Sequence, residues 1–238
     1  MNLIWRGIAG ACRLLWVMDP EILRITALTG KVSGTATFLA LIVGVPVGAY
    51  LGLYDFPGRK LLVSVINAAM GLPPVVVGLW VSIFLWRNGP LGFLGLMFTP
   101  AAMIIAQFII AAPVVAGVTL AGIQQINPKL IMQLQSLGAT RSQLMWLALR
   151  ESRLSLLAAL MAGFGAAVSE VGASMMVGGN ILGYSRVLTT AISMEVSRGE
   201  FEMAMALSFV LLALSYSASY VLTSIQQRRS FHARVSGR

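Results

Sequence analysis

The residue types that usually carry enzyme chemistry are scarce in this chain. Cys12 is the only cysteine and His232 the only histidine, so a single chain can form neither a disulfide nor a cysteine or histidine metal site. Gly30-Lys31 is followed by Val32 where a P-loop needs Ser or Thr, so the ATP-binding motif is missing. We therefore expect no catalytic residue, no metal site and no cofactor in this chain, and any ATP and Mg²⁺ to be bound by a partner.

The composition points to a membrane protein instead. Hydrophobic residues make up 58% of the 238 residues and charged residues 11%, which is more apolar than one soluble core requires. Runs without charge that are long enough to cross a bilayer predict five transmembrane helices, at 32–54, 61–86, 88–128, 154–169 continuing past Glu170, and 203–227. The third run includes a loop at 88–99 before its helix. Prolines are expected to kink or end these helices: Pro46, Pro73-Pro74, Pro100 and Pro113. The expected fold class is an all-α integral membrane protein.

The two ends of the chain differ from this middle. Charged residues interrupt every apolar window in residues 1–28, and Asp19-Pro20 is expected to break a helix. Trp5 and Trp16 suit an interfacial helix, and Arg13 argues against a signal peptide. The predicted domains are therefore an interfacial segment at 1–28, a transmembrane domain at 29–227 and a basic tail at 228–238.

The distribution of Lys and Arg predicts the orientation. If the 55–60 loop, the 127–153 segment and the tail share one side, that side holds Arg59, Lys60, Lys129, Arg141, Arg150, Arg153, Arg228, Arg229, Arg234 and Arg238. The loops of the other side hold Arg87, Arg186 and Arg198, with four more cations within the first 31 residues. The positive-inside rule makes the first side cytoplasmic, with the N-terminus outside. We attribute the net charge of +9 to this excess of Lys and Arg on the cytoplasmic side, because no continuous basic stripe that could bind nucleic acid is present.

The 127–153 segment carries strong local helix signals. Asn127-Pro128 is typical of a helix start, and Gly138 suits a helix end. Thr140 and Gln143 have the spacing of a capping box, so a second helix should follow, run through Trp146 and lead towards the fourth span. The apolar stripe Leu130, Ile131, Leu134 and Leu137 is too small to fold alone, which predicts docking into another protein. Packing on the protein's own bundle is the alternative, because it uses the same periodicity.

Glu170 is an acidic residue within an apolar run. A carboxylate near the bilayer centre costs roughly 2.5–3.5 kcal/mol on insertion scales, so it should face water or a partner. One interpretation places Glu170 beside a transport route, where its charge helps to hold a gate closed. The other makes it a structural tie to a donor such as Asn67, Gln107 or a backbone amide. Both interpretations remain open from the sequence.

Several of these residues resemble a known family. Leu137-Gly138-Ala139 resembles the coupling loop of ABC importer permeases, although Met132-Gln133-Leu134 stands where the family often has Glu-Ala-Ala. The block Ser169-Glu170-Val171-Gly172-Ala173 through Gly178-Gly179-Asn180 resembles molybdate and sulfate permeases. With Arg186 to Ile192 it is most similar to the tungstate-type branch. Together with Gly44-Val45-Pro46-Val47-Gly48, the resemblance covers about residues 25–227.

The resemblance implies a type I ABC importer permease fold in a prokaryotic inner membrane, and import of an oxyanion, tungstate before molybdate or sulfate. It also implies two ATPase subunits inside and a soluble oxyanion-binding protein outside, near 88–99 and 178–202. Five spans are few for enclosing a pathway, so a homodimer is expected. A stand-alone secondary transporter or channel is the rival, although no internal inverted repeat is evident.

Two groups of residues are expected to carry this function. The ATPase-coupling residues are Leu134, Gln135, Ser136, Leu137, Gly138, Ala139 and Thr140. The candidates for the pathway or its gate are Glu170, Gly172, Ala173, Met175, Met176, Gly178, Gly179, Asn180 and Asn67. Weak dipoles from Asn67, Ser64, Thr119, Gln107 and the Gly178-Gly179-Asn180 turn could contact the anion, but hydrogen bonds between helices would use the same groups.

Overall fold

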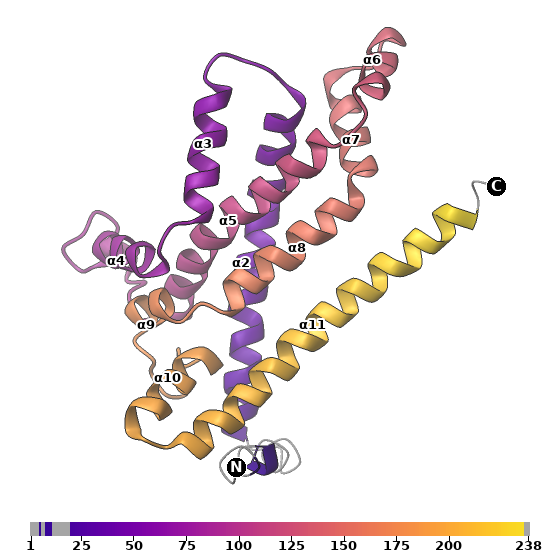
Figure 1. Ribbon diagram of the computed structural model, residues 1–238. Helices are drawn as coiled ribbons and strands as arrows, with labels where there is room; N and C mark the ends of the chain where they lie inside the picture. The colour runs from indigo at the N-terminus through magenta and orange to yellow at the C-terminus, as the bar shows by residue number, and fades with distance from the viewer. Residues whose placement is uncertain (1–4, 6–7, 11–19, 236–238) are drawn as a thin grey trace.

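The computed structural model describes residues 5, 8–10 and 20–235, with side chains as far as residue 224, and this part of the chain contains helices and no strand. Figure 1 labels the helices and shows them running back and forth between two ends. The helices are α2 (Pro20–Leu53), α3 (Arg59–Met70), α4 (Pro74–Leu85), the 3-10 turn η1 (Gly92–Leu94), α5 (Pro100–Gln124), α6 (Pro128–Ser136), α7 (Arg141–Glu151), α8 (Arg153–Val168), α9 (Gly172–Gly178), α10 (Leu188–Arg198) and α11 (Phe201–Val235). The all-α expectation is confirmed.

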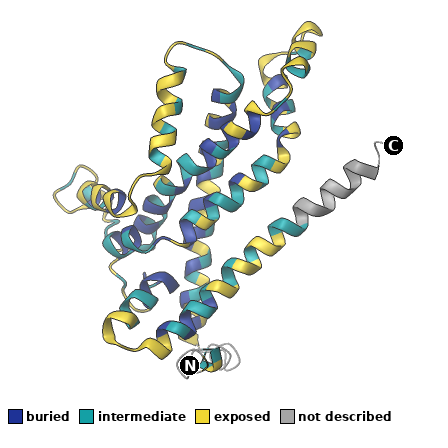
Figure 2. Ribbon diagram, viewed as in Figure 1, coloured by how far each residue is buried: buried dark blue, intermediate teal, exposed yellow. Residues whose placement is uncertain are grey.

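The centre of the fold is the packing of α2 against α5. Gly44, Gly48 and Gly52 repeat every fourth residue of α2 and so lie on one face of the helix. A Cβ at Gly44 would lie 2.9 Å from the carbonyl oxygen of Ala112, and a Cβ at Gly48 would collide with that of Ala116. The glycines therefore bring the two backbones into close contact. Figure 2 shows the buried residues concentrated on α2, α5 and the adjoining part of α8.

The predicted span 61–86 is broken at Pro73-Pro74, where a kink or helix end was expected. It is two helices, α3 and α4, bent by 101° at a short break. Gly71 ends α3, and Pro73 adopts an extended conformation (φ −62°, ψ 123°) before Pro74 starts α4. The cause is local, because a residue that precedes proline avoids the helical region. By contrast, Pro46 and Pro113 lie inside α2 and α5.

The predicted fourth span is also interrupted. α8 ends at Val168, and the chain turns through Ser169, Glu170 and Val171 before the short helix α9. At its other end, α8 meets α7 at a bend of 72°. The helix that starts at Thr140 thus leads to the fourth span through a corner. Within the described residues, three helices are long and apolar enough to cross a membrane, or up to five if each bent pair is one span.

The first helix starts earlier than the sequence indicates. α2 begins at Pro20, not near Val32, so residues 20–28 form the first turns of the same helix as residues 29–53. The break expected at Asp19-Pro20 coincides with this start. The interfacial helix expected in residues 1–28 falls mainly on residues 1–4, 6–7 and 11–19, which lie outside the described residues.

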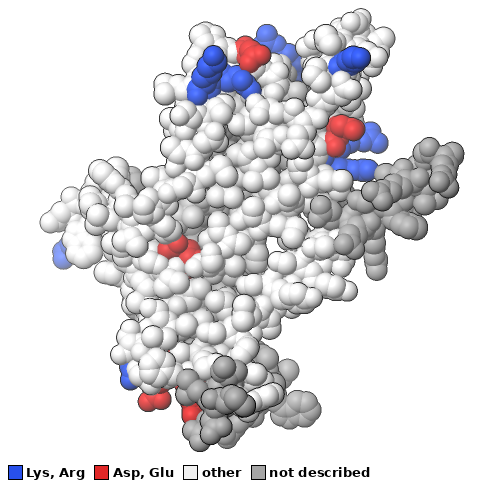
Figure 3. All heavy atoms as spheres, viewed as in Figure 1, with Lys and Arg blue, Asp and Glu red and all other residues white. Residues whose placement is uncertain are grey.

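The segments expected to share one side of the membrane do share one end of the molecule. The α2–α3 loop, α6 and α7 lie together at the upper end in Figure 1, and α11 rises towards the same end. Lys and Arg side chains gather at that end in Figure 3, whereas the broad band below it is almost free of charge. Such a band is what a bilayer requires of the surface that it surrounds.

Candidate functional site

The turn at Gly138 has the geometry of a Schellman motif, in which the last backbone groups of a helix are satisfied by the residues just beyond it. The amide of Ala139 donates to the carbonyl of Leu134 and that of Gly138 to Gln135, both at 3.0 Å. Gly138 has φ +80°, the left-handed region that favours glycine. Asn127 caps the start of α6, accepting from the amide of Lys129 at 2.9 Å. The predicted helix, glycine bend and helix are confirmed.

The two helices around this bend differ in how they pack. α6 has no buried residue, and Leu137 beside the bend is 83% exposed. α7 buries Leu144 and Ala148, the latter in a cluster with Ala49 of α2 and Ile123 of α5. The capping box also forms, since Thr140 accepts from the amide of Gln143 and donates its own amide to the Gln143 side chain. Thus α7 packs on its own bundle, whereas α6 presents its apolar side chains at the surface.

Glu170 lies at the break between α8 and α9. The residue is 5% exposed, and its Oε1 accepts a hydrogen bond of 2.6 Å from the backbone amide of Ala173. The Thr189 hydroxyl donates to the backbone carbonyl of Glu170 at 3.1 Å, which joins the start of α10 to the same break. The carboxylate therefore satisfies an amide at the start of α9. Of the three donors expected from the sequence, the backbone amide is the one present.

The other candidate residues of this block pack closely against α4 and α5. Ala173 lies so near Gly78 of α4 that a Cβ there would come within 2.6 Å of the Ala173 Cα. Gly178 packs against Met103, and Gly179 (φ +70°) against Phe98. Met175 and Met176 are half-buried, and Gly172 packs against Val75 of α4. The structure thus places this block at one junction of α4, α5 and α9.

The remaining polar candidates are not gathered at one place. Asn67 and Ser64 are exposed on α3. Gln107 is buried in α5 and donates to the hydroxyl of Ser174 at 3.1 Å. Thr119 is fully buried opposite Gly48. Gln107 therefore serves as a bond between helices, the alternative use considered from the sequence.

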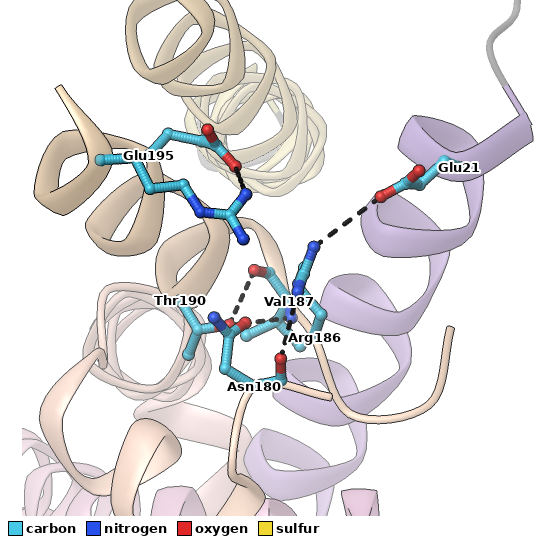
Figure 4. A network of polar contacts seen from close by, with 7 residues as sticks. Glu21, Asn180, Arg186, Val187, Thr190 and Glu195 are labelled. Carbon is cyan, nitrogen blue, oxygen red and sulfur yellow. Dashed lines mark hydrogen bonds and ion pairs between the residues drawn. The ribbon is translucent and has the colours of Figure 1, made fainter. Parts of the chain in front are cut away.

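A polar network at the lower end was not anticipated from the sequence. Figure 4 shows Arg186 between Glu21 of α2 and the backbone of Asn180. An Arg186 guanidinium nitrogen lies 3.9 Å from the carboxylate of Glu21, and another lies 3.4 Å from the Asn180 carbonyl. The Thr29 hydroxyl of α2 also accepts from the amide of Leu188 at 2.9 Å. The two contacts with α2 join residues over 150 positions apart, so no local sequence pattern predicts them. The signal available in the sequence was an arginine, Arg186, shortly after a Gly-rich turn; in the structure it is partly buried.

No group of three or more His, Cys, Asp or Glu side chains in the described residues could hold a metal ion. The arrangement offers a packed membrane bundle, an exposed helix at one end and a tightly joined block around Glu170. A family model described as "Binding-protein-dependent transport system inner membrane component" matches residues 44–231.

The chain belongs to that family.

Relatives matched over most of their length agree with this assignment. The chain is 40% identical over 227 residues to the tungstate uptake system permease protein TupB of Peptoclostridium acidaminophilum, covering 95% of this chain and 100% of the relative. It is 41% identical over 198 residues to a probable anion ABC transporter permease protein of Haloferax volcanii, covering 81% and 85%. It is 28% identical over 214 residues to the sulfate transport system permease protein CysW of a Synechocystis strain, covering 84% and 77%.

Solved structures show the same fold. The permease fold matches a chain of the inward-facing MetNI methionine ABC transporter with a TM-score of 0.74, covering 89% of this chain and 97% of that one at 21% identity. A chain of a bacterial alginate ABC transporter matches with a TM-score of 0.68, covering 87% and 80%. This family member therefore has the fold of ABC importer permeases and is a multi-pass transporter component. The description of the family names a transport system that depends on a binding protein.

Proposed function

We propose that this chain is the membrane-spanning subunit of an ATP-driven importer of a tetrahedral oxyanion, with tungstate as its cargo. The observation that carries the proposal is the 40% identity to a tungstate uptake permease over the whole length of that relative. The 41% identity to a probable anion permease supports the same class of cargo. Sulfate is the second candidate, because sulfate permeases are similar at 28% identity over most of this chain.

The exposed α6 is the proposed contact with the ATPase. It has no buried residue, ends in a rigid Schellman turn and continues into α7, which packs on the bundle. A force applied to residues 134–140 therefore passes through α7 to α2 and α5. The ATPase binds ATP and Mg²⁺, and this chain has neither a cofactor nor catalytic residues of its own. The proposal places the end that holds α6 in the cytoplasm, in agreement with its excess of Lys and Arg.

The transport pathway is proposed to form between two copies of the chain. α3 has no buried residue although its side chains are largely apolar, so one copy leaves much of the surface of this helix uncovered. A twofold dimer with two ATPase subunits would cover such surfaces by symmetry. The block from Glu170 to Asn180 and Asn67 of α3 are then candidates for the pathway and its gate. ATP-driven closure of the ATPases would tilt the two copies and open the route alternately to each side.

Co-purification and uptake test this function together. A tagged chain is co-expressed with its ATPase and binding protein, and uptake of labelled tungstate is measured with and without excess molybdate or sulfate. We expect uptake that needs the ATPase and is suppressed least by sulfate. Leu137→Glu should abolish ATPase co-purification, because it places a charge on the exposed apolar surface.

A matched control is available at the opposite end of the molecule. Leu182 is also exposed, at 54%, and Leu182→Glu should leave ATPase co-purification intact. Tungstate uptake by this chain alone in liposomes would overturn the ATP-driven importer in favour of a secondary transporter or channel. Strong competition by sulfate would change the assigned cargo and leave the transporter class standing.

A further inference from the structure

An apolar groove opens between α2 and α3 near the end that holds α7. Its volume is ≈ 660 Å³, and its walls include Val47 and Tyr50 of α2, Leu62 and Val65 of α3, and Met145 of α7. No charged residue lines it. Volumes of about 300–1,000 Å³ are typical of small-ligand sites. In Figure 1, α2 and α3 stand side by side there and are joined by a loop at the top.

Beyond the groove, a row of aromatic rings leads from Tyr50 to the guanidinium of Arg141. The Tyr50 ring centroid lies 5.1 Å from that of Tyr54 and 5.6 Å from that of Phe56. The guanidinium carbon of Arg141 lies 5.9 Å from the centre of the Tyr54 ring. Arg141 and Met145 are one helical turn apart and so lie on the same face of α7, the face that meets the groove.

The mouth of the groove carries uncompensated positive charge. In the described residues, Arg141 makes no ion pair with a carboxylate. Arg59 lies at the same end, donating its Nε to the Leu51 carbonyl at 2.7 Å. The carboxylate of Asp55, 3.3 Å from Arg59, is 96% exposed and therefore well solvated. An anion at the mouth would thus meet Arg59, which is paired with Asp55, and Arg141, which has no carboxylate partner among the described residues.

We propose that this groove binds an anionic phospholipid, with an acyl chain along α2 and α3 and the phosphate beside Arg141. The walls lie between membrane helices and are apolar, as an acyl chain requires, and the charge at the mouth is complementary to a headgroup. Basic pockets between helices on the cytoplasmic side suit anionic lipids, which are enriched in that leaflet. Only the choice of leaflet rests on the proposed orientation.

A lipid bound here would touch three elements at once. It would contact α2, α3 and α7, and α7 follows directly after the exposed helix α6. Occupancy of the groove would therefore hold α7 against the bundle. The lipid would act as a structural ligand that stiffens the link between α6 and the membrane helices, separate from the transported anion.

Lipid binding can be measured on the purified full-length chain in detergent by native mass spectrometry. Dioleoyl phosphatidylglycerol and dioleoyl phosphatidylcholine are added in turn, and the dissociation constant of the first bound lipid is determined for each. We expect tighter binding of phosphatidylglycerol. Arg141→Gln should weaken this lipid about fivefold, the effect of one interfacial cation, with little change for phosphatidylcholine.

Arg150→Gln is the matched control for the charge. Arg150 lies on the same helix, but its guanidinium carbon is 5.3 Å from the centre of the Trp146 ring, whereas that of Arg141 lies over the Tyr54 ring. Arg150→Gln should leave the dissociation constants of both lipids unchanged. Val47→Trp should fill the groove and remove both lipids, whereas Ile42→Trp, at an exposed position of α2 that does not line the groove, should retain them.

Three results would overturn the proposal. They are equal affinity of the wild-type chain for the two lipids, unchanged binding in both Val47→Trp and Arg141→Gln, and a disulfide between two copies of a Val65→Cys, Cys12→Ser chain. The last would assign the groove to the interface between protomers. Because the assay needs neither ATP nor tungstate, it can fail while the transport function stands, and the reverse also holds.

Discussion

The Oε1 atom of Glu170 lies 2.6 Å from the backbone nitrogen of Ala173, across the turn that separates α8 from α9. This hydrogen bond explains how a carboxylate is accommodated in an apolar run, because it satisfies an amide that the short helix leaves free. Thr189 binds the Glu170 carbonyl, so three helices meet at one residue. Substitutions that keep or remove this contact can therefore distinguish the gate interpretation of Glu170 from the structural one.

Glu170→Gln and Glu170→Leu should differ in stability. Glutamine keeps an acceptor for the Ala173 amide and should change the free energy of unfolding by less than about 1 kcal/mol, whereas leucine leaves the amide unpaired and should cost about 1–3 kcal/mol. Thermal unfolding in detergent measures this. We expect the glutamine variant to transport tungstate. If it is stable but inactive, the negative charge itself is required and Glu170 acts as a gate residue.

Gly138→Ala should weaken the turn after α6. A Cβ there meets nothing within 4 Å, so the cost comes only from φ +80° and should be about 1 kcal/mol. Gly138→Asn should recover part of this loss, since asparagine tolerates the left-handed region. ATPase activity of the complex, stimulated by loaded binding protein, gives the readout. Gly165→Ala, at an equally uncrowded helical position of α8, should leave that activity unchanged.

The contrast between α6 and α4 explains what the sequence could predict. Asn127, Gly138 and Thr140 act on their nearest neighbours, so the helices around residues 127–151 follow from local rules. Hydropathy at 61–86 measures only how apolar a segment is, and a helix bent by 101° is as apolar as a straight one. Pro73-Pro74 was a correct sign of a break, but Pro46 and Pro113 lie inside helices. The bond from the Ala173 amide to the Glu170 side chain spans only three residues, but it depends on where α9 begins, and hydropathy does not show that start. The bond from Thr189 to the Glu170 carbonyl joins residues 19 positions apart, so no local pattern indicates it.

Gly48→Ala should destabilise the contact between α2 and α5. The new methyl group would collide with the carbonyl of Ala116, and neither backbone can move aside freely, so we expect a loss of about 1–3 kcal/mol. Gly34→Ala is the matched control in the same helix, because nothing lies within 4 Å of its Cβ position. It should be neutral or slightly stabilising. Equal melting temperatures for the two variants would contradict the close packing.

Gln107 and Ser174 should show measurable coupling. Their side chains form a buried hydrogen bond of 3.1 Å between α5 and α9. A double-mutant cycle with Gln107→Leu and Ser174→Ala should give a coupling free energy of about 0.6 kcal/mol, the average for such bonds within membranes. Additive effects on unfolding in detergent would show that the bond contributes nothing. Loss of uptake without loss of stability would instead place Gln107 on the pathway.

Cysteine labelling should establish the orientation. In a Cys12→Ser background, Ser136→Cys and Leu182→Cys each introduce one thiol at an exposed position at opposite ends of the molecule. A membrane-impermeant maleimide added to intact cells should label Leu182→Cys, whereas Ser136→Cys should react only after the membrane is broken. The reverse pattern would contradict the assignment of the Lys- and Arg-rich end to the cytoplasm.

The glycine seam of α2 and α5 determines where this molecule can flex. With their backbones in contact at Gly44 and Gly48, the two helices form a stiff unit that transmits displacement along its length. The positions where the chain can bend are then the breaks between α3 and α4, at residues 71–73, and between α8 and α9, at residues 169–171. Displacement of the α2–α5 pair would then appear as rotation of α4 and α9 at these two breaks.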